Sequence, residues 1–186
     1  MIENKQDLEI YLEEDSKNYK SQVQGFFKRI KTNLLSNPIS EQKYIWRYIK
    51  TLRYVEYYDF KRKNNIIYYP YYIVLLSKLR KLSHITGFQI PPHVCGKGLT
   101  IWHWGSIIVN PSVRIGDNCT LYPGVLIGHK TLGDTPIIGN NVFIGSGTKI
   151  IGQVNIGDNV TIGQNCTIVK SIPANTTVVS SAVRSL

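Results

Sequence analysis

Residues 137–170 read IIGNNVFIGSGTKIIGQVNIGDNVTIGQNCTIVK. Isoleucine recurs at every sixth position from Ile138 to Ile168. The fifth place of each hexad is small or aliphatic, and the second place is often glycine. A flat strand would alternate with period two and would not need the periodic glycine. The pattern therefore indicates short strands separated by tight corners.

The same register extends towards the N-terminus. Val109, Ile115, Leu121 and Ile127 continue the six-residue series, and the excursion GHKTLGDTP at residues 128–136 interrupts it. Three hexads close one triangular coil, and stacked coils bury one continuous aliphatic column. Two of the three cysteines fall on small inward positions of this pattern. We therefore expect a β-solenoid over residues 87–186.

One more step of six from Val109 reaches His103, within IWHWGSIIVNPSV at residues 101–113. The six-residue pattern predicts an aliphatic residue at this position. We predict that the imidazole occupies an inward position of the coil and that it marks a functional site.

Residues 1–86 follow a different pattern. Ile45, Ile49 and Leu52 recur at helical spacing, and a second apolar stripe follows Pro70. We expect four or so short helices here. The predicted fold class is α+β, with an N-terminal helical region at residues 1–86 and a β-helix at residues 87–186.

The net charge of +10 predicts attraction to polyanions. Residues 21–86 hold 13 Lys and Arg against three Asp and Glu, and nine of the 12 tyrosines lie in residues 44–72. Packed tyrosines beside solvated lysines explain this best. Peripheral contact with an anionic membrane is the second interpretation. Because no nucleic-acid motif is present, we expect no nucleic-acid partner.

Cellular context follows from simple features. The three cysteines, Cys95, Cys119 and Cys166, form no CxxC pair and are expected as buried reduced thiols. The acidic start MIENKQDLEI is unlike a secretory signal, and no apolar run is long enough to span a membrane. We expect a cytoplasmic protein, in part peripheral to the membrane, with no metal site, since the histidines lack a carboxylate cluster.

The hexads resemble those of the hexapeptide-repeat acyltransferases, with the hallmark [LIV]-[GAED]-x-x-[STAV]-x. GFQIPPHVCGKGLTIWHWGSIIVNPSVRIGDN, residues 87–118, is similar to the serine acetyltransferase-like branch. KLSHITGFQIPP, residues 81–92, resembles members found in surface-polysaccharide gene sets. The resemblance implies a left-handed parallel β-helix, acetyl-CoA as co-substrate, and a homotrimer that the N-terminal helices extend to a dimer of trimers.

The resemblance also implies residue roles. His103 matches the family's catalytic histidine, a general base that removes the proton of a hydroxyl acceptor. Gln89 matches the aspartate that orients this histidine, and Trp102 replaces another aspartate. The excursion loop ends at Asp134-Thr135, where the family has an Arg-His pair that contacts the amino acid acceptor.

These departures favour a sugar over free serine, because the excursion loop lacks the arginine that would pair with a serine carboxylate. We expect Trp102 and Trp104 to offer aromatic faces, and His129 and Asp134 to contact the acceptor. In trimeric relatives the excursion loop reaches towards the neighbouring subunit's site. For acetyl-CoA the resemblance implies a groove between adjacent β-helices, and the residues that match it are Gly145, Ser146, Gly163, Lys170 and Arg184.

The sequence thus favours an acetyl-CoA-dependent O-acetyltransferase that acts by direct transfer on a sugar or surface-polysaccharide precursor. Two alternatives stay open. One is a serine O-acetyltransferase of cysteine biosynthesis, and the other is a non-catalytic trimeric scaffold.

Overall fold

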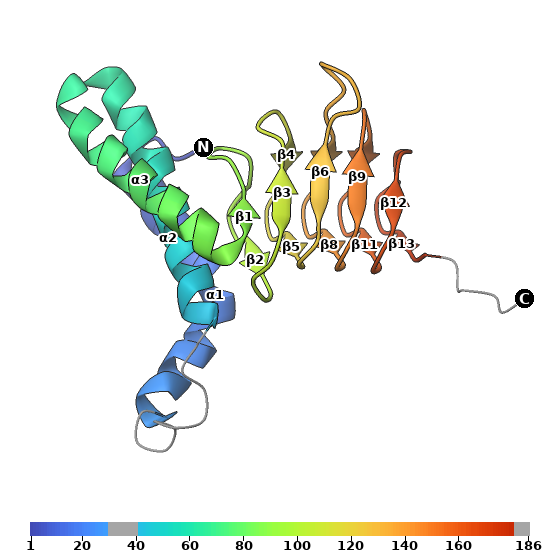
Figure 1. The fold of residues 1–186 in the computed structure, drawn as a ribbon, viewed down its shortest axis with the longest axis horizontal. Helices are drawn as coiled ribbons and strands as arrows, with labels where there is room; N and C mark the ends of the chain where they lie inside the picture. Colours follow the sequence, from blue (N-terminus) through green and yellow to red (C-terminus); the bar gives the residue numbers. More distant parts are fainter. Residues whose placement is uncertain (30–40, 181–186) are drawn as a thin grey trace, which may run out of the picture.

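The structure, a computed structural model, describes residues 1–29 and 41–180. Its helices lie at one end of a column of short strands (Figure 1). The helices are α1 (Lys5–Arg29), α2 (Glu41–Asn64), the 3-10 helix η1 (Ile66–Tyr68) and α3 (Tyr69–Thr86). The helical region is confirmed, but these α-helices are longer than expected. Among the described residues no helix is long and apolar enough to cross a membrane.

Local sequence explains the course of α2 and α3. The predicted stripe of α2, including Ile45, Ile49 and Leu52, is buried. Helix α3 has proline in its first turn, where a missing N–H costs nothing. It ends at Gly87, whose φ of 80° is left-handed and whose N–H bonds the Ser83 carbonyl.

The strands form three parallel sheets. The first sheet has the order β1 (Phe88–Gln89), β3 (Ile107–Val109), β6 (Leu126–Gly128), β9 (Lys149–Ile151) and β12 (Thr167–Ile168). The second has the order β10 (Asn155–Ile156), β7 (Ile137–Ile138) and β4 (Arg114–Ile115). The third has the order β13 (Thr177–Val178), β11 (Thr161–Ile162), β8 (Phe143–Ile144), β5 (Thr120–Leu121) and β2 (Thr100–Ile101).

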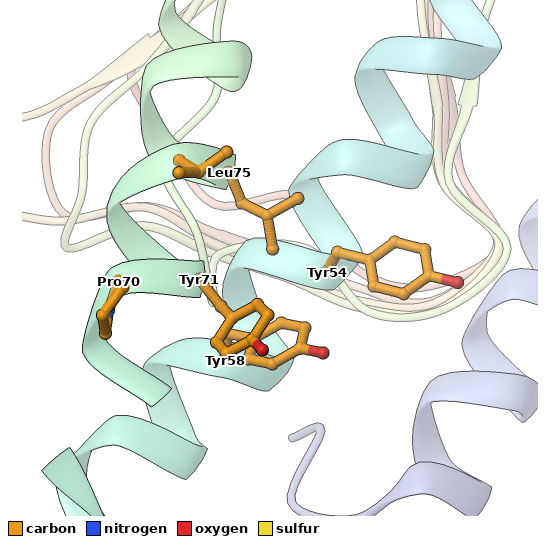
Figure 2. Close-up of a pocket in the computed structure, with 6 residues that line it drawn as sticks. Tyr54, Tyr58, Pro70, Tyr71 and Leu75 are labelled. Atoms are coloured by element: carbon orange, nitrogen blue, oxygen red, sulfur yellow. The ribbon is translucent and has the colours of Figure 1, made fainter. Parts of the chain in front are cut away.

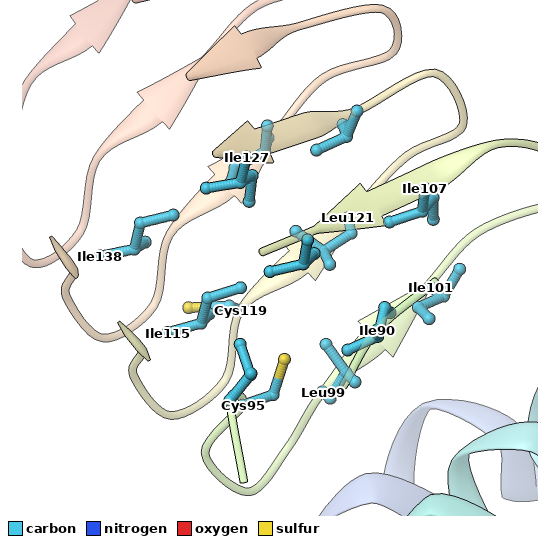
Figure 3. Close-up of a cluster of buried hydrophobic side chains, with 14 of the residues drawn as sticks. Ile90, Cys95, Leu99, Ile101, Ile107, Ile115, Cys119, Leu121, Ile127 and Ile138 are labelled. Atoms are coloured by element: carbon cyan, nitrogen blue, oxygen red, sulfur yellow. The ribbon is translucent and has the colours of Figure 1, made fainter. Parts of the chain in front are cut away.

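Parallel pairing stacks the hexads into columns, which confirms the β-helix. Ile127 pairs with Val109 on one side and with Ile150 on the other. Leu121 and Ile144 pair in the same way in the third sheet. Figure 3 shows Leu121 and Ile127 pointing into the interior of the coils. All of these paired aliphatic residues are almost completely buried. Parallel sheets demand burial of this kind.

The prediction for His103 was wrong in one respect. The residue that pairs with Leu121 in the first coil is Ile101, and it is fully buried. Val109, the inward residue of the next strand, follows Ile101 by eight positions instead of six, so this corner is two residues longer than a hexad allows. His103 therefore lies on an enlarged corner with its side chain 60% exposed, and it replaces no inward aliphatic residue.

Asparagines, rather than the periodic glycines, make several of the corners. Asn118, Asn141, Asn159 and Asn175 all have a φ between 56° and 59°, a left-handed conformation that Asn tolerates. Their side-chain amides hydrogen-bond in series along the solenoid, at 2.9–3.2 Å. The second-place glycines serve coil stacking instead. A Cβ on Gly116, for example, would lie 2.6 Å from the Gly139 carbonyl oxygen.

The helices cover the open end of the solenoid through buried polar contacts. Arg53 of α2 is fully buried and bonds Asp15 of α1 at 2.8 Å and Glu56 at 3.1 Å. Its guanidinium also donates to the backbone carbonyls of Cys95 and Gly96 in the first coil. Asp15 in turn accepts from the Leu99 N–H. This cluster joins both helices to the first coil.

We predict that Arg53→Met destabilises the protein by about 3–5 kcal/mol, because two buried carboxylates lose their cation. Urea unfolding followed by circular dichroism measures this change. Arg62→Met is the matched control: Arg62 pairs with Asp59 nearer the surface, so its loss is expected to cost about 1 kcal/mol or less. Equal, small effects of the two variants would contradict a central role for Arg53.

Candidate active site

The enlarged corner at residues 102–106 is held on both sides by the helices. Before it, the Tyr19 hydroxyl of α1 donates to the Ile101 carbonyl and accepts from the Ile101 N–H. Burial raises the pKa of Tyr19, so this hydroxyl stays protonated. Within the corner, the Gly105 N–H donates to the carbonyl of Thr86, the last residue of α3. A Cβ on Gly87 would lie 2.9 Å from the Gly105 carbonyl, so the close approach needs glycine.

His103 has a left-handed φ of 63° at this corner. Its Nδ1 lies 2.7 Å from Oε1 of Glu41, the first residue of α2. A carboxylate only accepts, so Nδ1–H donates and Nε2 of the neutral ring keeps its lone pair. The Glu41 side chain is 25% exposed, and the imidazole is 60% exposed. The arrangement presents a tautomerically fixed base to whatever lies beyond this corner.

Gln89 does not take the orienting place expected for it. It lies exposed on β1 and lines a pocket of 330 Å³ with Tyr48, Arg80 and Pro111. Among the described residues, no hydrogen bond joins Gln89 to His103. The reason is that Gln89 pairs with Ile108, beyond the corner, while Glu41 reaches the ring from α2.

The two tryptophans beside His103 differ in their surroundings. Trp104 packs against the core, and its ring lies 5.9 Å from that of Tyr44 in α2. It contributes to the joint between the corner and the helices. Trp102 is half-buried, and its backbone N–H donates to the Leu121 carbonyl at 3.3 Å.

His129 and Asp134 lie on a different edge of the triangular coil. The His103 edge joins the third sheet to the first, whereas the excursion loop joins the first sheet to the second. His129 Nδ1 accepts from the Asn110 side-chain amide at 2.7 Å. Asp134 accepts from the Thr131 hydroxyl within the loop. A single chain therefore does not bring these residues together with His103.

Of the residues expected at acetyl-CoA, three share the His103 edge. Gly145, Ser146 and Gly163 lie at the corners of the third and fourth coils, about 10 and about 14 Å along the column from the first coil, from the spacing of parallel strands. Coil stacking alone explains Gly145, since its Cβ would lie 2.7 Å from the backbone of Gly163. Exposed Lys170 lies on the excursion-loop edge, and Arg184 lies outside the described residues.

The cysteines are all buried. Burial strongly raises the pKa of the Cys95 thiol, and burial raises the pKa of the Cys119 thiol to about 11. Neither is a thiolate near neutral pH, and a thiolate is the nucleophilic form. In the part of the chain that the structure describes, no group of three or more His, Cys, Asp or Glu side chains is placed to hold a metal ion.

Glu41 is the residue that the sequence analysis missed. It lies 62 positions from His103, and it carries no motif. The only feature that distinguishes Glu41 in the sequence is that it is one of three acidic residues in the basic region 21–86.

Comparison with known proteins identifies related sequences. Residues 135–170 match the family described as bacterial transferase hexapeptide (six repeats). A serine acetyltransferase of Helicobacter pylori is 32% identical over 120 residues, which are 62% of this chain and 70% of that protein. One of Staphylococcus epidermidis is 40% identical over 109 residues, which are 56% of this chain. The match spans half the length of the staphylococcal protein.

Solved structures share the architecture. Serine acetyltransferase isoform 3 of Entamoeba histolytica, in complex with cysteine, superposes with a TM-score of 0.66 at 24% identity, over 96% of this chain and 60% of that one. The soybean serine acetyltransferase apoenzyme gives a TM-score of 0.70 at 20% identity, over 96% of this chain and 69% of that one. At these identities the likeness shows the fold alone.

Proposed function

Because the chain belongs to the hexapeptide-repeat transferase family, we propose that it is an acetyl-CoA-dependent O-acetyltransferase with His103 as its general base. The observation that carries this proposal is the pairing of His103 Nδ1 with the Glu41 carboxylate at 2.7 Å. A carboxylate in this position fixes the tautomer, and it stabilises the imidazolium that forms when the ring takes a proton.

The reaction is a direct transfer. His103 Nε2 removes the proton of the acceptor hydroxyl as the hydroxyl oxygen attacks the thioester carbonyl of acetyl-CoA. The tetrahedral intermediate collapses, the carbon–sulfur bond breaks, and the imidazolium returns its proton to the leaving thiolate. No acyl-enzyme is needed. The buried thiols support this, since burial raises the pKa of Cys95 and of Cys119.

L-Serine is the acceptor that the relatives favour, because the similar proteins are named serine acetyltransferases. This supports the alternative from the sequence analysis over the sugar acceptor that we expected there. Glu41 lessens the weight of one departure, since it supplies the orienting carboxylate that Gln89 lacks.

A sugar hydroxyl is the second candidate. The observation in its favour is the end of the excursion loop, Asp134-Thr135, which offers no cation for a serine carboxylate. Half-buried Trp102 beside His103 adds an aromatic face. A sugar needs neither an ammonium nor a carboxylate partner.

We propose a homotrimer in which the excursion loop of one chain approaches the His103 edge of the next. The support is the separation of His103 and His129 on different edges of one chain. Gly145, Ser146 and Gly163 would line the acetyl-CoA groove along the His103 edge, with Lys170 supplied from the excursion-loop edge.

We predict that His103→Ala lowers kcat by roughly 10²–10⁴ and leaves acetyl-CoA affinity unchanged, as loss of a general base does. Glu41 is a positioning residue, so a graded series tests it. Glu41→Gln keeps an acceptor for Nδ1–H but loses the charge, and we expect a loss of about tenfold in kcat. Glu41→Leu loses both, and we expect about 10².

Steady-state kinetics, acetyl-CoA binding by calorimetry and thermal melting together decide whether Glu41 positions His103 or stabilises the fold. Exposed Glu9→Gln is the matched control. A fall in Tm that parallels the fall in kcat would assign Glu41 a structural role. Retained activity in His103→Ala would remove the imidazole from the mechanism.

We predict that L-serine is the better acceptor, with kcat/KM above roughly 10⁴ M⁻¹s⁻¹, a value ordinary for a cognate substrate. Labelled acetyl-CoA with L-serine and a panel of hexose and amino-sugar glycosides measures the preference. A sugar that reacts far faster than serine would restore the sugar acceptor. Absence of both turnover and CoA binding would favour the non-catalytic scaffold.

We predict a particle mass of three times the 21.2 kDa of one chain by light scattering, or six times that mass if trimers pair through their helices. Mixing His103→Ala chains with His129→Ala chains distinguishes shared sites from separate ones, provided that each variant alone is impaired. Sites shared between chains would regain activity in the mixture. An active monomer at micromolar concentration would contradict the proposed trimer.

A further inference from the structure

The hairpin formed by α2, η1 and α3 turns at the end of the molecule away from the strands (Figure 1). We call residues 61–74 the hairpin tip. Its large apolar side chains are uncovered: Ile66 is 75% exposed, Ile67 64%, Tyr71 59% and Val74 68%. Side chains of this size are usually buried, and a contiguous exposed group of them marks a contact surface.

An apolar pocket of 520 Å³ opens beside the tip, lined by Tyr54, Tyr58, Pro70, Tyr71, Val74 and Leu75. Figure 2 shows Tyr71 of α3 lying against Tyr58 of α2, and their rings stack with centroids 5.7 Å apart. Tyrosines of this kind, with an apolar ring and a polar hydroxyl, concentrate where an apolar phase meets water.

The surroundings of the tip are strongly basic. Residues 60–86 contain six Lys and Arg and no Asp or Glu. Asp59, just before them, is already paired with Arg62 at 2.6 Å and with Lys63 at 2.7 Å. Lys78 and Lys81 follow on the exposed side of α3.

We propose that the hairpin tip docks on an anionic lipid membrane, with Ile66 and Ile67 entering the headgroup region and the flanking lysines contacting lipid phosphates. Apolar groups beside cations are the composition of membrane-surface segments. A second copy of this chain fits less well, because two tips of equal positive charge repel each other. Nucleic acid would leave both isoleucines without a partner.

Co-sedimentation of the full chain with vesicles tests the proposal directly. Neutral phosphatidylcholine vesicles are compared with vesicles that contain about 30% phosphatidylserine. We expect binding to the anionic vesicles only, and weaker binding as salt is added. Ile66→Ser with Ile67→Ser should weaken binding by about tenfold or more. Lys78→Gln and Lys81→Gln should each weaken it by about fivefold.

Val179→Ser is the matched control, since Val179 is an equally exposed aliphatic residue, 72% exposed, at the far end of the solenoid. It should bind as the unchanged chain does. Equal binding to neutral and anionic vesicles, or full binding by the isoleucine variant, would overturn the proposal. Loss of an oligomer in the isoleucine variant, without any vesicle binding, would assign the tip to contact between copies instead. The measurement does not depend on acetyl transfer.

Discussion

The first coil of the solenoid has no coil before it, and its open backbone groups need partners. The helices provide them. Arg53 bonds two carbonyls of this coil, while Asp15 and Glu56 accept from the N–H groups of Leu99 and His93. The Tyr19 and Tyr48 hydroxyls each bond both backbone groups of one coil isoleucine. Unpaired edge strands invite pairing with other chains, so the helices act as a cap that protects the backbone of the first coil.

The column itself could be predicted from the sequence, because its period is local. Each of Ile138, Ile144 and Ile150 follows its predecessor by six residues and lies where the hexad places it. The first coil could not be predicted, because its corner is enlarged to meet α1 and α3. The register counted back from Val109 therefore reached His103, although Ile101 is the residue that points inward.

The candidate site was predictable only in part. The resemblance drew attention to His103, but the carboxylate beside it comes from Glu41, far away in the chain. The resemblance pointed to Gln89, but Gln89 pairs with Ile108, on the far side of the corner from the His103 ring. Such a contact depends on how α2 docks against the coil, and no local pattern encodes that docking. His129 and Asp134 raise a different difficulty, since within one chain they lie on a different edge of the coil from His103.

The cap also has a consequence for the order of folding. Asp15 and Leu99 are 84 residues apart, whereas neighbouring coils join residues such as Val109 and Ile127, one turn apart. Solenoids can nucleate at any coil and propagate to the next, but contacts between distant segments form slowly. The later coils can thus assemble before the helices dock against the first coil. The corner that carries His103 would then be the last part to fold. In a newly made chain, most of the solenoid would be folded before the candidate active site is formed.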